Sequence, residues 1–162
     1  MSWHPPRHPP AGTPHGAGGV CITSDNQRLV LRGDHYTRED LPTPWTYTQV
    51  VVATGTRLVF VAGQEPEDAH GNLVGAGDLA AQAQQVFANL GRALAAAGAR
   101  PEQVTKLTIY VVGHRREYLP VIEQARVALF ADHKPADALS GVQTLSNPDY
   151  LIEVEAIAVA DG

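Results

Sequence analysis

Apolar side chains recur at helical spacing in the segment that follows Asp78. They are Leu79, Ala83, Val86, Phe87, Leu90 and Leu94. This spacing places them on one face of a helix, for which Asp78 is a favourable N-cap and Gly98 a favourable end. A second helix is predicted over residues 116–130, provided that Pro120 lies in its first turn.

Other apolar runs have the length and the flanking turn residues that are typical of β-strands. They lie at 47–55, 57–66, 101–113, 138–145 and 150–160. Only a short gap separates the first two runs, which predicts that they pair with each other as antiparallel neighbours.

The predicted elements follow the order β-β-α-β-α-β-β after an N-terminal extension. This order defines an α+β fold in which two helices pack on one mixed sheet. A right-handed crossover is expected where the first helix links two strands. Because two helices cover only one face of such a sheet, the other face needs polar side chains or a partner, and we expect an oligomer.

Composition divides the chain into three parts. Residues 1–19 contain five prolines and four glycines, so we expect a disordered tail. Residues 20–44 form an extension in which two apolar runs flank "SDNQ", and this pattern predicts a β-hairpin at 20–33. Residues 45–162 hold all the other predicted elements and form the main domain.

Charge and cysteine content disfavour several classes of protein. A net charge of −5 disfavours nucleic-acid binding, because phosphate contacts require clustered lysine and arginine. Cys21 is the single cysteine, so neither an intrachain disulfide nor a cysteine-based zinc site is expected. The N-terminus has no apolar signal region and no apolar run approaches about 18 residues, so we expect a cytoplasmic protein without membrane contact.

Six segments, in their order and spacing, resemble the Rid (YjgF-type) reactive-intermediate deaminase family. They are "YTQ", "VAGQEP", "QVFANLGRALAAAG", "VTKLTIYVV", "HKPA" and "IEVEAIAVA", and they span about residues 45–160. The resemblance implies a chorismate-mutase-like sandwich that forms homotrimers with small-molecule sites in clefts between subunits. It also implies hydrolysis of enamines and imines, such as 2-aminoacrylate, to a keto acid and ammonia, with no metal or organic cofactor.

The resemblance also implies site residues. Tyr47 falls at a site tyrosine, and Gly63, in "AGQ", falls at a glycine whose backbone approaches the ligand. Glu153 matches the carboxylate that positions or activates the attacking water. We also expect Ala136, in the "PA" pair, to contact the substrate. In the deaminating members an arginine follows this pair and binds the substrate carboxylate, but here that position is Asp137.

Asp137 changes the expected substrate. An arginine binds a carboxylate through two charge-assisted hydrogen bonds, whereas an aspartate adds like charge. Two negative charges about 4 Å apart repel by roughly 4 kcal/mol at an effective dielectric near 20, which weakens binding about a thousandfold. We therefore expect a neutral or cationic substrate, unless Arg115 or Arg116 binds the carboxylate instead.

Our hypothesis for the chemistry is that Glu153 acts as general acid or base, with Asp137 or Glu65 as its counterpart. Crowded carboxylates favour such a division, because they push one pKa upward. Structural alternatives stay open: Asp137 caps a turn after "KPA", Glu65 faces water and Tyr47 packs as an aromatic. Glu155 shares a strand face with Glu153, and we expect it to be a solvated or interface residue.

Three functions are compatible with these residues. The first is a Rid-like enzyme that acts on a small imine, enamine or enol-type metabolite by hydrolysis, tautomerisation or elimination, with a preference altered from 2-aminoacrylate. The alternative is a non-catalytic trimer that binds a small molecule in the same cleft. The third is a structural or chaperone-like trimer in which the cleft has no role.

Overall fold

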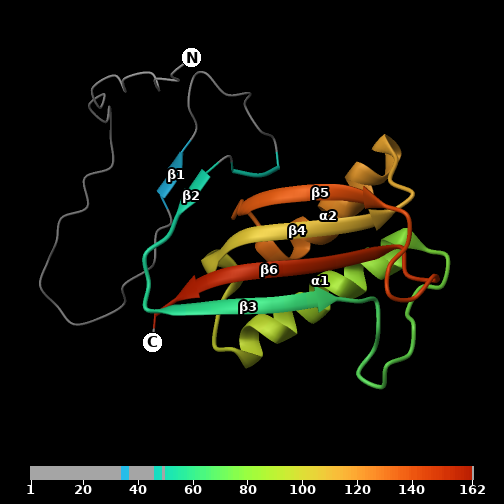
Figure 1. Cartoon of the computed structure of the whole chain (residues 1–162), viewed down its shortest axis with the longest axis horizontal. Helices are drawn as coiled ribbons and strands as arrows, with labels where there is room; N and C mark the ends of the chain where they lie inside the picture. The colour runs from blue at the N-terminus through green and yellow to red at the C-terminus, as the bar shows by residue number, and fades with distance from the viewer. Residues whose placement is uncertain (1–33, 37–45, 49, 162) are drawn as a thin grey trace, which may run out of the picture.

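A four-stranded mixed sheet with two helices on one of its faces forms the body of the protein (Figure 1). The computed structural model describes residues 34–36, 46–48 and 50–161. The tail predicted at 1–19, the hairpin predicted at 20–33 and Cys21 lie outside the described residues. Neither helix of the described part combines the length and the apolar character that crossing a membrane requires.

The sheet has the strand order β3-β6-β4-β5. Its strands are β3 (Arg57–Gln64), β4 (Val104–Val112), β5 (Ala136–Val142) and β6 (Ile152–Ala160). β6 runs antiparallel to both of its neighbours, β3 and β4, whereas β4 and β5 run parallel. The helices are α1 (Leu79–Ala96), between β3 and β4, and α2 (Leu119–Phe130), between β4 and β5. The predicted α+β fold, with two helices packed on one mixed sheet, is confirmed.

The predicted pairing of the runs at 47–55 and 57–66 is wrong. The first run yields β2 (Val50–Val52), which pairs instead with β1 (Asp34–Tyr36) in a separate two-stranded sheet. The second run yields β3, which pairs with β6 from Arg57 opposite Ala160 onwards. The backbone N–H of Thr56 already donates to the carbonyl of Ala160, at 3.2 Å. β3 therefore pairs with the long strand β6 and not with the short strand β2.

Both ends of α1 and the start of α2 follow the local chemistry predicted for them. The Asp78 side chain accepts hydrogen bonds from the backbone N–H groups of Ala80 (2.9 Å) and Ala81 (3.2 Å), as an N-cap does. Gly98 follows α1 with a φ of 66°, a conformation that favours glycine. Residues 116–118 form a short 3-10 helix before α2, and Pro120 lies in the first turn of α2 as expected.

The core lies between the sheet and the two helices. Its buried members from the helices include Val86, Leu90, Leu94 and Ile122, and those from the sheet include Leu107, Ile109, Val111, Ile152 and Val154. Burial alternates strictly along β6, where every second side chain faces this core and the others lie on the open face of the sheet.

The open face of the sheet, which is turned to the viewer in Figure 1, carries large apolar side chains. On β3, Leu58 is 62% exposed and Phe60 is 72% exposed, while Val59 and Val61 pack against the core. A chain that leaves such side chains in water favours association. These exposed apolar side chains are a reason to expect a partner on this face.

The start of β6 is anchored to the start of α1 by the buried side chain of Gln82. Its amide nitrogen donates to the carbonyls of Gly75 (3.1 Å) and Asp149 (3.0 Å). Its amide oxygen accepts from the backbone N–H of Leu151, at 2.7 Å. One side chain therefore satisfies three backbone groups that converge where β6 begins.

We expect Gln82→Ala to lower the free energy of unfolding by about 3 kcal/mol, because buried backbone groups lose their partners. Gln84→Ala is the matched control, since Gln84 lies on the exposed side of the same helix and its loss should cost less than about 0.5 kcal/mol. Urea unfolding followed by circular dichroism measures both. Equal midpoints for the two variants would contradict the anchoring role.

Candidate functional site

Glu153 lies on the open face of the sheet, near the start of the central strand β6. Its neighbours in sequence, Ile152 and Val154, are fully buried in the core. In the register with β4, Glu153 lies opposite Tyr110, which shares the open face. The core thus fixes the direction in which this carboxylate points.

Gly63 of β3 leaves space for the Glu153 carboxylate. A Cβ atom at Gly63 would lie 1.7 Å from Oε1 of Glu153, a distance that no real contact allows. The register of β3 with β6 shifts between Val61 and Gln64, next to this point. The glycine of the "AGQ" segment therefore lies where its backbone meets the acid, although its predicted contact with a ligand stays a prediction.

Glu65 follows directly after β3 and lies close enough to Glu153 to raise the pKa of that carboxyl group. Its side chain accepts a hydrogen bond from the hydroxyl of Ser146. Glu65 is half-buried, and both its predicted role at the site and the alternative in which it faces water stay open.

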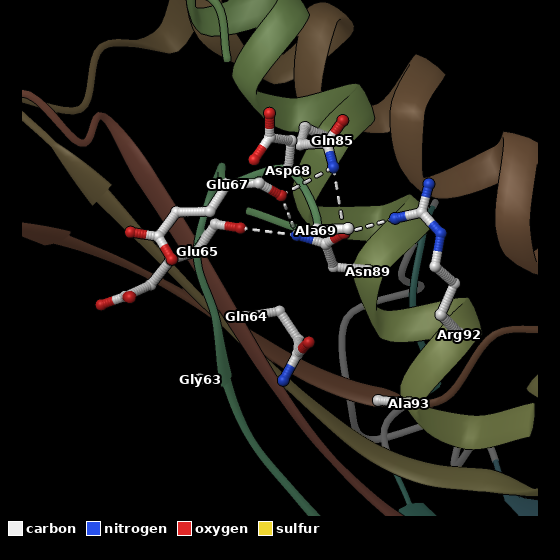
Figure 2. Close-up of a pocket in the computed structure, with 10 residues that line it drawn as sticks. All are labelled: Gly63, Gln64, Glu65, Glu67, Asp68, Ala69, Gln85, Asn89, Arg92 and Ala93. Carbon is white, nitrogen blue, oxygen red and sulfur yellow. Dashed lines mark hydrogen bonds between the residues drawn. The ribbon is translucent and has the colours of Figure 1, made fainter. Parts of the chain in front are cut away.

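Polar side chains of α1 hold the loop that begins at Glu65 (Figure 2). Asn89 donates to the carbonyls of Glu65 (2.8 Å) and Glu67 (2.9 Å), and Gln85 donates to the carbonyl of Glu67 at 2.8 Å. Arg92 in turn donates to the side-chain oxygen of Asn89 at 2.5 Å. A cavity of about 680 Å³ lies among these residues, and Gly63 lines it as well.

The surroundings of Glu153 favour its protonated form. Partial burial raises the pKa of Glu153, and the negative charges of Glu65 and Glu155 raise it further. Glu155 itself accepts a hydrogen bond from the hydroxyl of Tyr110, at 3.1 Å. A carboxyl group with a raised pKa, beside a second carboxylate, has the properties of a general acid and base.

Asp137 lies on the other side of the sheet. It pairs with Leu107 of the buried row, so its side chain faces α2, and it does not meet Glu65 or Glu153 within one chain. It is the second residue of β5, which corrects the alternative of a turn cap. Burial raises the pKa of Asp137 to about 6, although the charges of Arg126 and Lys106 oppose this shift.

Tyr47 and Asp137 line the same cavity, of about 690 Å³, between β5 and α2. The backbone N–H of Thr48 donates to the carbonyl of Pro135, at 3.1 Å, and so holds the Tyr47 segment beside the start of β5. Ala136 pairs with Lys106, in the row next to that of Asp137. The structure thus brings Tyr47 and Asp137 together on one side, and Gly63, Glu65 and Glu153 together on the other.

Sequence reasoning missed Arg126, the only arginine among the described residues that is buried. Glu123 accepts from its Nε (2.8 Å) and from its Nη2 (2.5 Å), and Arg126 lines the cavity of Tyr47 and Asp137. The signal was its position, because Ile122, Arg126 and Phe130 recur every four residues and so share the buried stripe of α2. Arg116, one of the two arginines considered as substitutes, lines this cavity as well.

Metal ligands do not gather in the part of the chain that the structure describes. No group of three or more histidine, cysteine, aspartate or glutamate side chains there is placed to hold an ion.

Comparisons with known proteins agree on one family. The family model described as Endoribonuclease L-PSP matches residues 37–160. A RutC family protein of Pyrococcus horikoshii is 33% identical over 121 residues, which cover 74% of this chain and 92% of that protein. The 3-aminoacrylate deaminase RutC of Acinetobacter baylyi is 32% identical over 119 residues, which cover 72% of this chain and 90% of that protein.

The solved structures include a protein of unknown function from Yersinia pestis, YyfB, of the conserved Rid protein family. It has a TM-score of 0.73 and 38% sequence identity, and the match covers 78% of this chain and 97% of that one. Together with the α+β fold, these matches show that the chain belongs to the Rid family. The family recognised in the sequence is thereby confirmed.

Glu153→Gln should stabilise the protein at neutral pH. The pKa of Glu153 is higher in the folded than in the unfolded chain, so this group favours folding at low pH, and that contribution is lost as pH rises through the folded-state pKa. We expect Glu153→Gln to melt at a higher temperature than the parent at pH 7.5, and the difference to shrink towards pH 4. The control is Glu117→Gln at an exposed position. A destabilised Glu153→Gln protein at pH 7.5 would refute this account of the site.

Proposed function

We propose that this protein is a cofactor-independent deaminase that hydrolyses small imines and enamines to a carbonyl compound and ammonia. The observation that carries the proposal is the Glu153 carboxylate, which lies against Gly63 on the open face with its pKa raised. Family membership supports the reaction class, since one relative bears the name 3-aminoacrylate deaminase. An enamine enters the same route after a proton adds to its carbon and gives the iminium ion.

In the proposed mechanism Glu153 first accepts a proton and then donates it. Its carboxylate takes a proton from water as the water oxygen bonds to the iminium carbon, which yields a carbinolamine. The resulting carboxylic acid protonates the nitrogen, the carbon–nitrogen bond breaks and ammonia leaves. The remaining hydroxyl proton is lost as the carbonyl forms. Glu65, which accepts a hydrogen bond from Ser146, lies beside Glu153, and its carboxylate would stabilise the cationic iminium.

Charge favours a small molecule over RNA as the substrate, although the description of the family model names an endoribonuclease. The chain has a net charge of −5, and the carboxylates of Glu65, Glu153 and Glu155 lie near one another. A phosphate backbone would meet repulsion at such a site. The same carboxylates favour an iminium ion, which carries positive charge.

We also propose that the protein is a homotrimer whose sites lie between subunits. The exposed Leu58 and Phe60 support an interface on the open face of the sheet, which also carries Glu153. A second copy on this face would remove apolar side chains from water and would also enclose the acid. Exclusion of bulk water strengthens the electrostatic effects on which the mechanism relies.

Glu153→Gln should lower ammonia release by about 10²- to 10⁴-fold, because it removes the group that moves the proton. The assay supplies 2-imino acids in the cuvette from an amino-acid oxidase acting on alanine, leucine and phenylalanine, and 3-aminoacrylate separately. The exposed Glu117→Gln variant is the control and should retain the parent rate. A Glu153→Gln protein as fast as the parent would exclude this role. Ligand binding by the parent without turnover would favour the binding-protein alternative.

Phe60→Asp should yield a monomer and abolish ammonia release, since a carboxylate at this exposed position cannot be buried against another copy. Light scattering after size-exclusion chromatography measures the mass. Gln84→Asp, on the exposed side of α1, is the control and should remain a trimer with full activity. A parent protein that is monomeric and active would contradict the proposed assembly.

A further inference from the structure

The loop of residues 65–67 is held to α1 at both of its ends through its backbone carbonyls (Figure 2). The carbonyl of Glu65 accepts a hydrogen bond from Asn89 at 2.8 Å. The carbonyl of Glu67 accepts one from Asn89 at 2.9 Å and one from Gln85 at 2.8 Å. Pro66, between the two carbonyls, is fully buried. The backbone from which the Glu65 side chain departs is therefore positioned by the helix.

The amide of Asn89 can take only one orientation at this loop. Gln85, Asn89 and Arg92 are spaced four and three residues apart, so they lie on one face of α1. The Oδ1 atom of Asn89 accepts from Nη1 of Arg92 at 2.5 Å and from Nε2 of Gln85 at 3.0 Å. A guanidinium group has donors only, so Oδ1 must face Arg92 and Nδ2 must face the two carbonyls. All four hydrogen-bonding positions of the amide are thereby used.

The side chain of Glu65 connects this loop to the proposed site. On the open face, Glu153 has Glu65 and Glu155 as its negatively charged neighbours, and it lies opposite Tyr110 of β4. Lys106, also from β4, lines a small cavity together with Glu155. Of these groups only Glu65 lies outside the sheet. Its distance from Glu153 can therefore change while the register of the strands stays the same.

We infer that Asn89 is a positioning residue, which holds the 65–67 loop so that the Glu65 carboxylate stays beside Glu153, and that Arg92 orients its amide. Asn89 lies on a helix that covers one face of the sheet, whereas Glu153 lies on the other face. Asn89 therefore acts on the acid through Glu65. The inference deepens the proposed function and rests on it insofar as it concerns ammonia release.

An NMR titration of protein labelled with ¹³C in the glutamate carboxyl groups tests the inference without any turnover. The signal of Glu153 is the one that Glu153→Gln lacks. We expect its titration midpoint to fall in Asn89→Ala and in Glu65→Gln, because each change removes or displaces a negative charge beside Glu153. The double variant Glu65→Gln/Asn89→Ala should have the midpoint of Glu65→Gln, because Asn89 acts through Glu65. A parent-like midpoint in Asn89→Ala, or a further fall in the double variant, would overturn the inference.

Arg92→Met decides the question if Asn89→Ala does not fold, because it keeps Asn89 and alters only an exposed side chain. We expect the midpoint of Glu153 to fall in this variant, since the amide of Asn89 loses its charged donor. The loss of a cation by itself would raise the midpoint instead. A midpoint that is unchanged or raised would thus refute the role of Arg92. Gln84→Ala, on the exposed side of the same helix, is the control and should titrate like the parent.

Ammonia release provides the functional measurement. Asn89→Ala should be about tenfold slower than the parent at neutral pH, and the acid side of its pH profile should move to lower pH, as the titration midpoint does. The titration and the rate separate the two claims. An inactive parent in which the midpoint falls as expected refutes only the proposed function. An active parent whose Asn89→Ala variant titrates unchanged refutes only this inference.

Discussion

The alternation of side chains along β6 is the constraint on which the rest of the structure depends. β6 is hydrogen-bonded on both sides, to β3 and β4, so its register is fixed by two neighbours at once. Ile152 and Val154 are buried under the helices, and Glu153 between them must therefore lie on the open face. A slip of one residue would bury this carboxylate and expose the core residues. The hydrophobic core, rather than any local feature of the acid, places Glu153 at its site.

The same register places Asp137 and Glu153 on opposite faces of the sheet, although the sequence analysis expected these two carboxylates to act together. Leu107 of β4 lies opposite Ala156 of β6 and opposite Asp137 of β5, so all three belong to the buried row. The pKa of Asp137 and that of Glu153 are both raised, but the charges around the two side chains differ. Around Glu153 the neighbouring charges are carboxylates, which add to the effect of burial. Around Asp137 the strongest neighbouring charge is a guanidinium group, which opposes it. The two carboxyl groups therefore lie on opposite faces of the sheet in different electrostatic environments.

Local patterns were sufficient to predict the helices and the last strand. Asp78, Gly98 and Pro120 act through groups within a few residues of themselves, and the alternation of β6 is visible in its own letters. The partner of β3 and the side of the sheet on which Asp137 lies were not predictable, because both depend on pairing between strands that are distant in sequence. The same applies to the hydrogen bond from Ser146 to Glu65, which joins residues 81 positions apart.

Arg126 poses a question of stability. A buried ion pair is often no more stable than apolar side chains of the same volume, because both charges lose their water. Glu123 compensates for two of the guanidinium nitrogens, and the unpaired Nη1 adds a further cost. Leucine or methionine would serve the core of α2 without this cost, as Ile122 and Phe130 do on the same stripe. The packing of α2 therefore does not by itself require a charged side chain at position 126.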